Sequence, residues 1–314
     1  MEKSENSEKE FTELNTKLFE RTGPGCKTAE MMAVHRFAES QKPEGERICY
    51  DPYAVYFISQ EMMEALKKRA NDPEKAKEEA EKIERFLPGL SNSIRAKFRY
   101  FDDFIERSID DGIEQLVILG AGYDSRAYRM DGLMGKVKVF EIDHPSAQIV
   151  KIEKIKQIFG SLPDRVAYVP VDLGIDDLEQ KLIEKGYDKS KKTLFILEGV
   201  IFYIPPENVD YILSFIVKNS GKGSAVLFDY FPKSVVDGTS QLEVGINIHY
   251  QLIQAGEPMQ FGIEEGTVEK FLEERGFSQV CDVTSEDYKR MYFQGVNKDR
   301  SVCSLMSFVH AVVR

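Results

Sequence analysis

The sequence predicts an α/β fold built around a doubly wound parallel sheet. From Gly112 onward, short apolar runs rich in Val, Ile, Leu and Phe alternate with amphipathic stretches. Such runs are typical of strands buried on both faces, and their alternation with helices indicates right-handed crossovers that cover both sides of a sheet. The residues before Gly112 have helical periodicity and contain no run of this kind, which predicts a helical segment in front of the sheet.

Three stretches of the N-terminal part have helical character. Residues 27–40 and 92–109 repeat apolar side chains at helical spacing. Between them, residues 61–86 are dense in Lys, Glu and Ala and predict one or two helices with a solvated, charged face. We expect residues 1–110 to form an N-terminal helical cap or lid and residues 111–314 to form the core, together making one integrated domain.

The core is expected to contain strands joined by helices, followed by a less regular stretch at 231–262. A helix, a strand near 278–283 and a last apolar run at 304–313 complete the chain. The five strands before the irregular stretch are predicted at 116–120, 138–142, 166–171, 193–199 and 224–230, and the helices between them at 145–159, 176–186 and 206–219.

Charge and composition exclude several classes of function. Lys and Arg total 42 against 53 for Asp and Glu, a formal net charge of −11, and no concentrated basic block offers a surface for nucleic acid. No apolar stretch approaches the roughly 20 residues that span a bilayer, and the polar N-terminus lacks the apolar centre of a signal peptide, so we expect a cytoplasmic protein. Four widely separated cysteines and four histidines show no metal-ligand spacing, so no metal site is expected.

The first predicted strand runs directly into Gly120-Ala121-Gly122. Glycines at this point let the backbone turn sharply and approach a ligand, and a helix that follows offers unpaired N–H groups. A dinucleotide fingerprint would have a third glycine at position 125, where this chain has Ser125. The pattern is also compatible with a tight strand-to-helix turn that binds nothing.

The ends of the next three strands carry acidic residues. The second strand ends in Glu141 and Asp143, the third is followed by Asp172, and the fourth ends in Glu198-Gly199. An acid about 20 residues beyond the glycines is placed to accept the hydroxyls of a ribose, although Asp143 is also a candidate helix N-cap. Because ligands of open α/β sheets bind outside the carboxyl ends of the strands, these tips together predict a binding site.

The acidity of these strand ends indicates which ligand fits. Four carboxylates would repel a pyrophosphate and favour a cationic ligand. S-adenosylmethionine has an adenine, a ribose and a sulfonium-bearing amino acid, and no phosphate. A nicotinamide oxidoreductase is the alternative, since it shares the sheet and the early glycines.

Four motifs, in order, carry a resemblance to a known family: LGAGYDSRAYR, FEIDHP, VDL and LEGVIFYI. In this order they resemble the leucine carboxyl methyltransferase-like family of S-adenosylmethionine-dependent methyltransferases, which includes protein carboxyl and natural-product O-methyltransferases. The resemblance covers roughly residues 25–314. It implies a Rossmann-like class I methyltransferase with a seven-stranded sheet whose last strand is antiparallel, and a pocket covered by the N-terminal helices and residues 231–262.

The resemblance also implies roles at the methionine end of the cofactor. Gly120 and Gly122 would line the methionine moiety, and Glu198 would face its amino group. In the family an arginine before the FDD-like segment binds the cofactor carboxylate, and by counting this position is Lys97, with Arg99 as the near alternative.

At the nucleoside end, Asp143 with Glu141 beside it would hold the ribose. Asp172 would accept a hydrogen bond from the adenine, and Leu173 would pack on its ring.

The expected reaction is methylation of an oxygen nucleophile, because the sequence shows no recognisable general base and a carboxylate needs none at pH 7. We expect a carboxylate or activated hydroxyl of a small molecule. The alternatives are a protein C-terminal carboxyl group and a non-catalytic protein that holds S-adenosylhomocysteine. Tyr203 is the candidate substrate-binding residue, with a packed aromatic as its other interpretation. His35 and His249 are further candidate bases, but a lone histidine is more often structural, and both are interpreted so.

Overall fold

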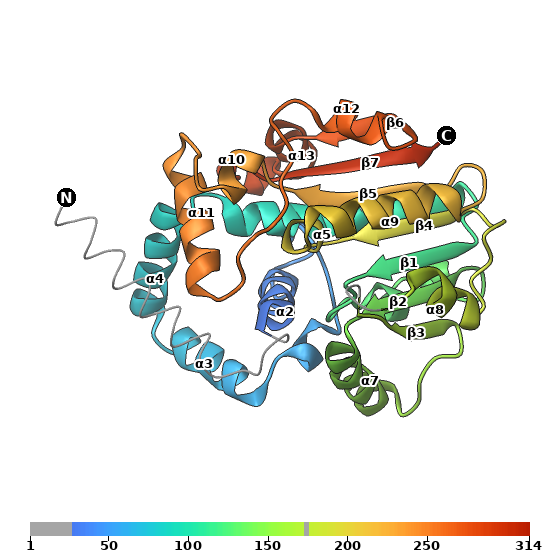
Figure 1. The fold of residues 1–314 in the computed structure, drawn as a ribbon. Helices are drawn as coiled ribbons and strands as arrows, with labels where there is room; N and C mark the ends of the chain where they lie inside the picture. The colour runs from blue at the N-terminus through green and yellow to red at the C-terminus, as the bar shows by residue number, and fades with distance from the viewer. Residues whose placement is uncertain (1–26, 173–175) are drawn as a thin grey trace.

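A seven-stranded mixed sheet forms the centre of the computed structural model, which describes residues 27–172 and 176–314 (Figure 1). The strand order is β3-β2-β1-β4-β5-β7-β6; β1 to β5 are parallel, and β7 runs antiparallel to both of its neighbours. The predicted fold class, including the antiparallel last strand, is confirmed. The strands are β1 (Gln115–Leu119), β2 (Lys138–Asp143), β3 (Val166–Pro170), β4 (Thr193–Leu197), β5 (Ala225–Tyr230), β6 (Phe277–Val283) and β7 (Ser307–Val313).

The direction in which successive strands are added reverses between β1 and β4. The chain builds β1, β2 and β3 outward on one side, then returns to place β4 and β5 on the other. At such a reversal the connections leave in opposite directions and open a crevice outside the carboxyl ends of the two central strands. This topology positions the site described below.

Helices cover both faces of the sheet. In Figure 1, α9 (Pro206–Lys218) lies in front of β4 and β5, and α5 (Leu90–Asp110) lies behind them. Ring contacts join α9 to the sheet through Phe215 and Phe195, and α5 to it through Phe101 and Phe308. The other core helices are α6 (Arg126–Arg129), α7 (Pro145–Phe159), α8 (Leu178–Glu184), α12 (Val268–Glu273) and α13 (Ser285–Tyr292), with 3-10 turns η2 (Asp131–Leu133), η3 (Ile201–Tyr203) and η4 (Gly295–Asn297).

A second group of helices gathers beyond the carboxyl ends of β1 and β4 (Figure 1). The charged stretch predicted at 61–86 forms two helices of this group, which begin after the side-chain caps Ser59 and Asp72. Its assignment as only a solvated face was incomplete, because Ile83 borders a cavity. The group consists of α2 (Lys27–Ser40), η1 (Ala54–Phe57), α3 (Gln60–Ala70), α4 (Pro73–Phe86), α10 (Lys233–Val236) and α11 (Glu243–Gln254).

One hydrophobic cluster extends from Ala33 in α2 to Val313 in β7, so the N-terminal helices and the sheet share a core. The division into a cap and a core at residue 110 stays a prediction. Among the described helices, none is both long and apolar enough to cross a membrane.

Candidate active site

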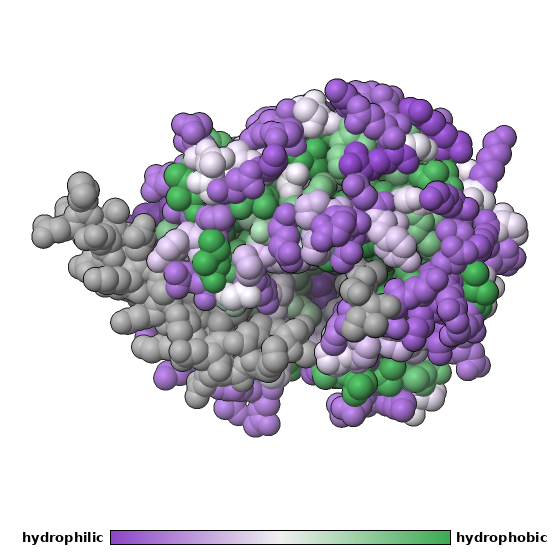
Figure 2. All heavy atoms as spheres, in the orientation of Figure 1, coloured by the Kyte–Doolittle hydropathy of each residue, from purple (hydrophilic) through white to green (hydrophobic). Residues whose placement is uncertain are grey.

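A cavity of about 710 Å³ lies between the carboxyl ends of β1 and β4 and the second group of helices. Figure 2 shows that this face of the molecule is hollowed near its centre. The volume is within the range of about 300–1,000 Å³ that is usual for ligand pockets. The lining joins two different surfaces: one is the glycine-rich and acidic edge of the sheet, and the other is a largely apolar wall of helices.

The loop after β1 is held in a conformation that glycine alone adopts without strain. Gly120 has a φ of +66°, and a Cβ placed on it would lie 2.3 Å from Cγ2 of Val200. Gly122 has a φ of +40°, and its N–H donates a hydrogen bond of 2.6 Å to Oδ2 of Asp143. Both glycines line the cavity. The loop is therefore a wall of the pocket as well as a turn.

Asp143 lies at the tip of β2 and borders the cavity. Its Oδ1 accepts the N–H of His144 at 2.7 Å. The N-cap of α7 is His144, whose ring nitrogen accepts the N–H of Ser146 at 3.3 Å, so the interpretation of Asp143 as the cap is wrong. Two backbone donors fix the Asp143 carboxylate, and each of its oxygens keeps a lone pair for a ligand.

Glu198, directly after β4, also lines the cavity and pairs with Arg126 at 2.6 Å. Arg126 forms further ion pairs of 2.6 Å with Asp102 and with Asp124. Burial is the largest influence on the pKa of Asp124 and would raise it, but Arg126, Lys151 and Arg129 together outweigh burial and hold this pKa at about 2. Arg126 was not among the predicted site residues, although it stands within the LGAGYDSRAYR motif.

Lys97 projects from α5 to the base of the cavity, where its Nζ lies 3.0 Å from Oδ2 of Asp229. Both side chains are buried, and Oδ1 of Asp229 accepts the N–H of Gly199 at 2.6 Å. Arg99 instead pairs with Asp103 at 2.7 Å on a half-exposed face and is not among the lining residues. Of the two candidates, the structure brings Lys97 to the cavity. Asp229 was missed; the signal was an acid within the apolar run SAVLFDY.

Glu141 is fully buried and is not among the residues that line the cavity. Its Oε2 lies 2.9 Å from Nζ of Lys151 and accepts a hydrogen bond of 3.0 Å from Tyr128. Burial, opposed by Lys151, raises the pKa of Glu141 to about 7. Lys151 also donates to the carbonyl oxygen of Ala121 at 3.3 Å. This pair therefore supports the glycine loop from behind, and the structure does not bring Glu141 to the expected ribose position.

The adenine assignment rests on residues at the edge of what the structure describes. Asp172 does not line the cavity; its Oδ2 lies 3.9 Å from Nε2 of His144, and its N–H donates to Asp176 at 2.9 Å. Leu173 lies outside the described residues. The roles of both stay predictions.

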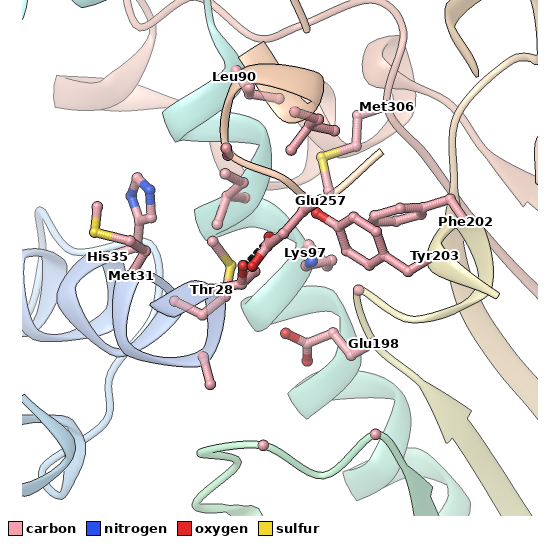
Figure 3. A pocket seen from close by; sticks show the side chains of 18 of the residues that line it. Thr28, Met31, His35, Leu90, Lys97, Glu198, Phe202, Tyr203, Glu257 and Met306 are labelled. Atoms are coloured by element: carbon pink, nitrogen blue, oxygen red, sulfur yellow. Dashed lines mark hydrogen bonds between the residues drawn. The ribbon is translucent and has the colours of Figure 1, made fainter. Parts of the chain in front are cut away.

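Tyr203 lines the apolar side, with its ring 4.6 Å from that of Phe202. Figure 3 shows Lys97, Glu198, Tyr203 and Glu257 reaching the same space from different parts of the chain. Burial, together with Glu257 and Asp229, raises the pKa of the Tyr203 hydroxyl well above its usual value, so this group is a hydrogen-bond donor at neutral pH.

Neither of the two histidines considered as bases has the required properties. Burial, with Arg95 and Lys97 nearby, lowers the pKa of His35 to about 3, which makes it a weak base although it lines the cavity. His249 does not line the cavity. The described residues also contain no group of three or more His, Cys, Asp or Glu placed to hold a metal ion.

Residues 29–217, more than half of the chain, match the family model described as leucine carboxyl methyltransferase. The chain belongs to the leucine carboxyl methyltransferase family. It is 27% identical to YktD of Bacillus subtilis, named as an S-adenosyl-L-methionine-dependent methyltransferase, over 82% of each chain. It is 36% identical to a Mycolicibacterium smegmatis protein of the same designation, over 65% of this chain and 66% of that one.

Two solved structures share the fold of this methyltransferase. A Thermobifida fusca protein described as a methyltransferase has a TM-score of 0.54 at 14% identity and matches 75% of this chain and 86% of its own. A Streptomyces avermitilis protein described as a member of the duf574 family has a TM-score of 0.51 at 14% identity. The match covers 90% of this chain and 97% of the Streptomyces protein. The resemblance inferred from the motifs is confirmed, and with it the class of S-adenosylmethionine-dependent methyltransferase.

Proposed function

We propose that this methyltransferase transfers a methyl group from S-adenosylmethionine to a carboxylate or activated hydroxyl oxygen of a small molecule. The observation that carries the proposal is a cavity in which a glycine-lined, acidic half adjoins an apolar half. A cofactor and an acceptor bound in the two halves would meet inside the protein, away from water.

The residues of the acidic half fit the chemistry of this cofactor. Asp143 can accept hydrogen bonds from ribose hydroxyls, and Glu198 can pair with the amino group. Lys97 has three donors and gives one to Asp229, which leaves two for the cofactor carboxylate. The lining includes four carboxylates and two cations, a balance that favours a ligand with a sulfonium charge over one with phosphates.

When bound, S-adenosylmethionine supplies an electrophilic methyl group: the acceptor oxygen forms the new C–O bond, the C–S bond breaks and its electron pair stays on sulfur. This chain contributes alignment and exclusion of water. The glycine loop, tied to Asp143 and supported by Lys151, fixes the donor side. Tyr203 can donate a hydrogen bond to the acceptor, and a hydroxyl acceptor can release its proton to Glu257, which lines the apolar half.

A protein C-terminal carboxylate is the second candidate acceptor, because the matched family is described as leucine carboxyl methyltransferase. A small molecule is favoured by the mainly apolar wall opposite the sheet edge. Residues from α4, the turn after it, α5 and α11 form this wall: Ile83, Leu87, Leu90, Ile94, Ile248 and Leu252.

Transfer of a radiolabelled methyl group to fractionated cell extract tests the proposal. We expect the label on a low-mass product; release of the label by mild base would identify an ester, and resistance to base an ether. Label on a protein C-terminus would replace the small molecule by the alternative acceptor. Label on nucleic acid, or none on any fraction, would contradict the proposed function.

A further inference from the structure

We propose that the apolar half of the cavity selects a neutral acceptor whose hydroxyl group hydrogen-bonds to Gln251, in preference to a carboxylate acceptor. This inference rests on the proposed function and narrows its substrate class.

Gln251 lies on α11 and lines the cavity. Its Oε1 is buried and accepts no hydrogen bond from the residues that the structure describes. A buried amide oxygen without a partner is unfavourable, since it has lost water and gained nothing in return. Rotation of the amide about its terminal bond exchanges oxygen and NH₂, so this group can either accept a hydrogen bond from a ligand hydroxyl or donate one to it. A ligand with one hydroxyl would satisfy it.

Gln251 belongs to a cavity wall that is mainly apolar. Ile248 and Leu252 flank it on the same helix, and Leu87, Leu90 and Phe202 line the same cavity. In such surroundings a single hydrogen bond contributes strongly to selectivity, because a ligand that lacks the matching group leaves the amide unpaired.

The charged groups of the lining disfavour an acceptor carboxylate. Arg36 pairs with Asp51 at 2.8 Å, and Lys97 pairs with Asp229 at 3.0 Å. No other Lys or Arg is among the described lining residues, and Glu257, which accepts a hydrogen bond from Thr28, adds negative charge to this half. The two donors that Lys97 keeps are assigned to the cofactor carboxylate, so an acceptor carboxylate would be desolvated without a further cation to compensate it.

The chemistry of a hydroxyl acceptor balances with groups at the site. A lone pair of the hydroxyl oxygen forms the C–O bond, and the C–S bond breaks toward sulfur to give neutral S-adenosylhomocysteine. The hydroxyl proton passes to the Glu257 carboxylate and from there to water.

A matched pair of probes, 2-naphthol and 2-naphthoate, tests the inference in protein saturated with S-adenosylhomocysteine. Because the chain has no tryptophan, naphthyl fluorescence can be followed without indole emission. We expect 2-naphthol to bind at least about tenfold more tightly than 2-naphthoate. Equal or tighter binding of 2-naphthoate, or binding of neither probe, would overturn the inference. If the wild type did not bind S-adenosylhomocysteine at all, the proposed function itself would fail.

Variants of α11 test the part played by Gln251. Gln251→Leu should weaken 2-naphthol binding about tenfold and abolish the preference for 2-naphthol over 2-methoxynaphthalene, with S-adenosylhomocysteine affinity unchanged. The matched control is Gln254→Leu, which makes the same substitution at an exposed position of the same helix that does not line the cavity. It should bind all probes as the wild type does.

Gln251→Asn keeps the amide on a shorter side chain and should show a smaller loss of 2-naphthol affinity than Gln251→Leu. Unchanged 2-naphthol affinity in folded Gln251→Leu and Gln251→Asn would remove Gln251 from the acceptor site.

Discussion

At the scale of single residues, Lys97 and Asp229 compensate each other's charge at the base of the cavity. Their side chains are 3% and 0% exposed, so neither charge is solvated when its partner is removed. Breaking a buried pair by removing one partner costs about 3–5 kcal/mol of stability. We predict a loss of this size in the free energy of unfolding of Lys97→Met, measured by chemical denaturation.

The double variant Lys97→Met/Asp229→Asn is the control for this prediction. It removes both charges and keeps an acceptor for the N–H of Gly199, so it should recover part of the lost stability. A double variant as unstable as the sum of the two single changes would show that the two residues are not coupled.

Glu141 gives a pH-dependent contribution to stability. Its pKa is raised from 4.5 to about 7 in the folded protein, so between these pH values the folded state binds more protons than the unfolded state. Its favourable contribution is therefore complete below about pH 4.5 and is lost as pH rises to about 7. We predict that the free energy of unfolding of the wild type, minus that of Glu141→Gln, falls over this interval. A difference that is constant with pH would contradict the prediction.

The sequence located the residues at strand ends but not the residues that support them. Gly120, Asp143 and Glu198 follow from the rule that ligands bind outside the carboxyl ends of parallel strands, and all three line the cavity. Glu141 stands two residues before Asp143, about 7 Å deeper along the strand, where it meets Lys151 rather than the pocket. The acid in the apolar run SAVLFDY marked Asp229 as unusual, but its pairing with Lys97 could not be anticipated, because Lys97 comes from a helix 132 residues away.

At the scale of elements, the loop after β1 joins the sheet to the site. In Gly120→Ala the new methyl group would collide with Val200, and the residue would be held at a positive φ. We predict that this variant loses at least about tenfold in S-adenosylhomocysteine affinity, measured by calorimetry, because the loop must shift.

Gly112→Ala is the matched control for the loop variant. Gly112 also has a positive φ, +80°, but nothing lies within 4 Å of a Cβ placed on it. It should lose about 1–2 kcal/mol of stability from backbone strain alone and keep its cofactor affinity. Equal cofactor affinities of the two variants would exclude the loop from the site.

Helices were predicted from their periodicity, but periodicity did not show which surfaces they cover; only the family resemblance implied that the N-terminal helices and residues 231–262 cover the pocket. The Lys- and Glu-rich stretch at 61–86 indicated solvated helices, and most of its residues are exposed. Its last turn nevertheless brings Ile83 to the cavity. One apolar residue in a charged helix carries too little signal to show which neighbour it meets.

At the scale of the whole molecule, the alternation of strands and helices was enough to predict the fold class. The order of the strands was not contained in that pattern, because periodicity shows that a strand is buried without showing which strand lies beside it. The cavity depends on this order: the reversal between β1 and β4 opens the crevice, and α2, α4 and α11 close it from the other side. The cavity therefore forms where the strand ends, the N-terminal helices and α11 meet, although these segments lie far apart in the sequence.

Calorimetric titration tests the central claim most directly. The wild type and Asp143→Ala are each titrated with S-adenosylhomocysteine, and the wild type is also titrated with NAD. We predict one S-adenosylhomocysteine bound per wild-type chain and no binding of NAD. In Asp143→Ala we predict an affinity lower by roughly 10- to 150-fold, as expected for a lost hydrogen bond to a charged group. Binding of NAD, or unchanged S-adenosylhomocysteine affinity in folded Asp143→Ala, would contradict the account.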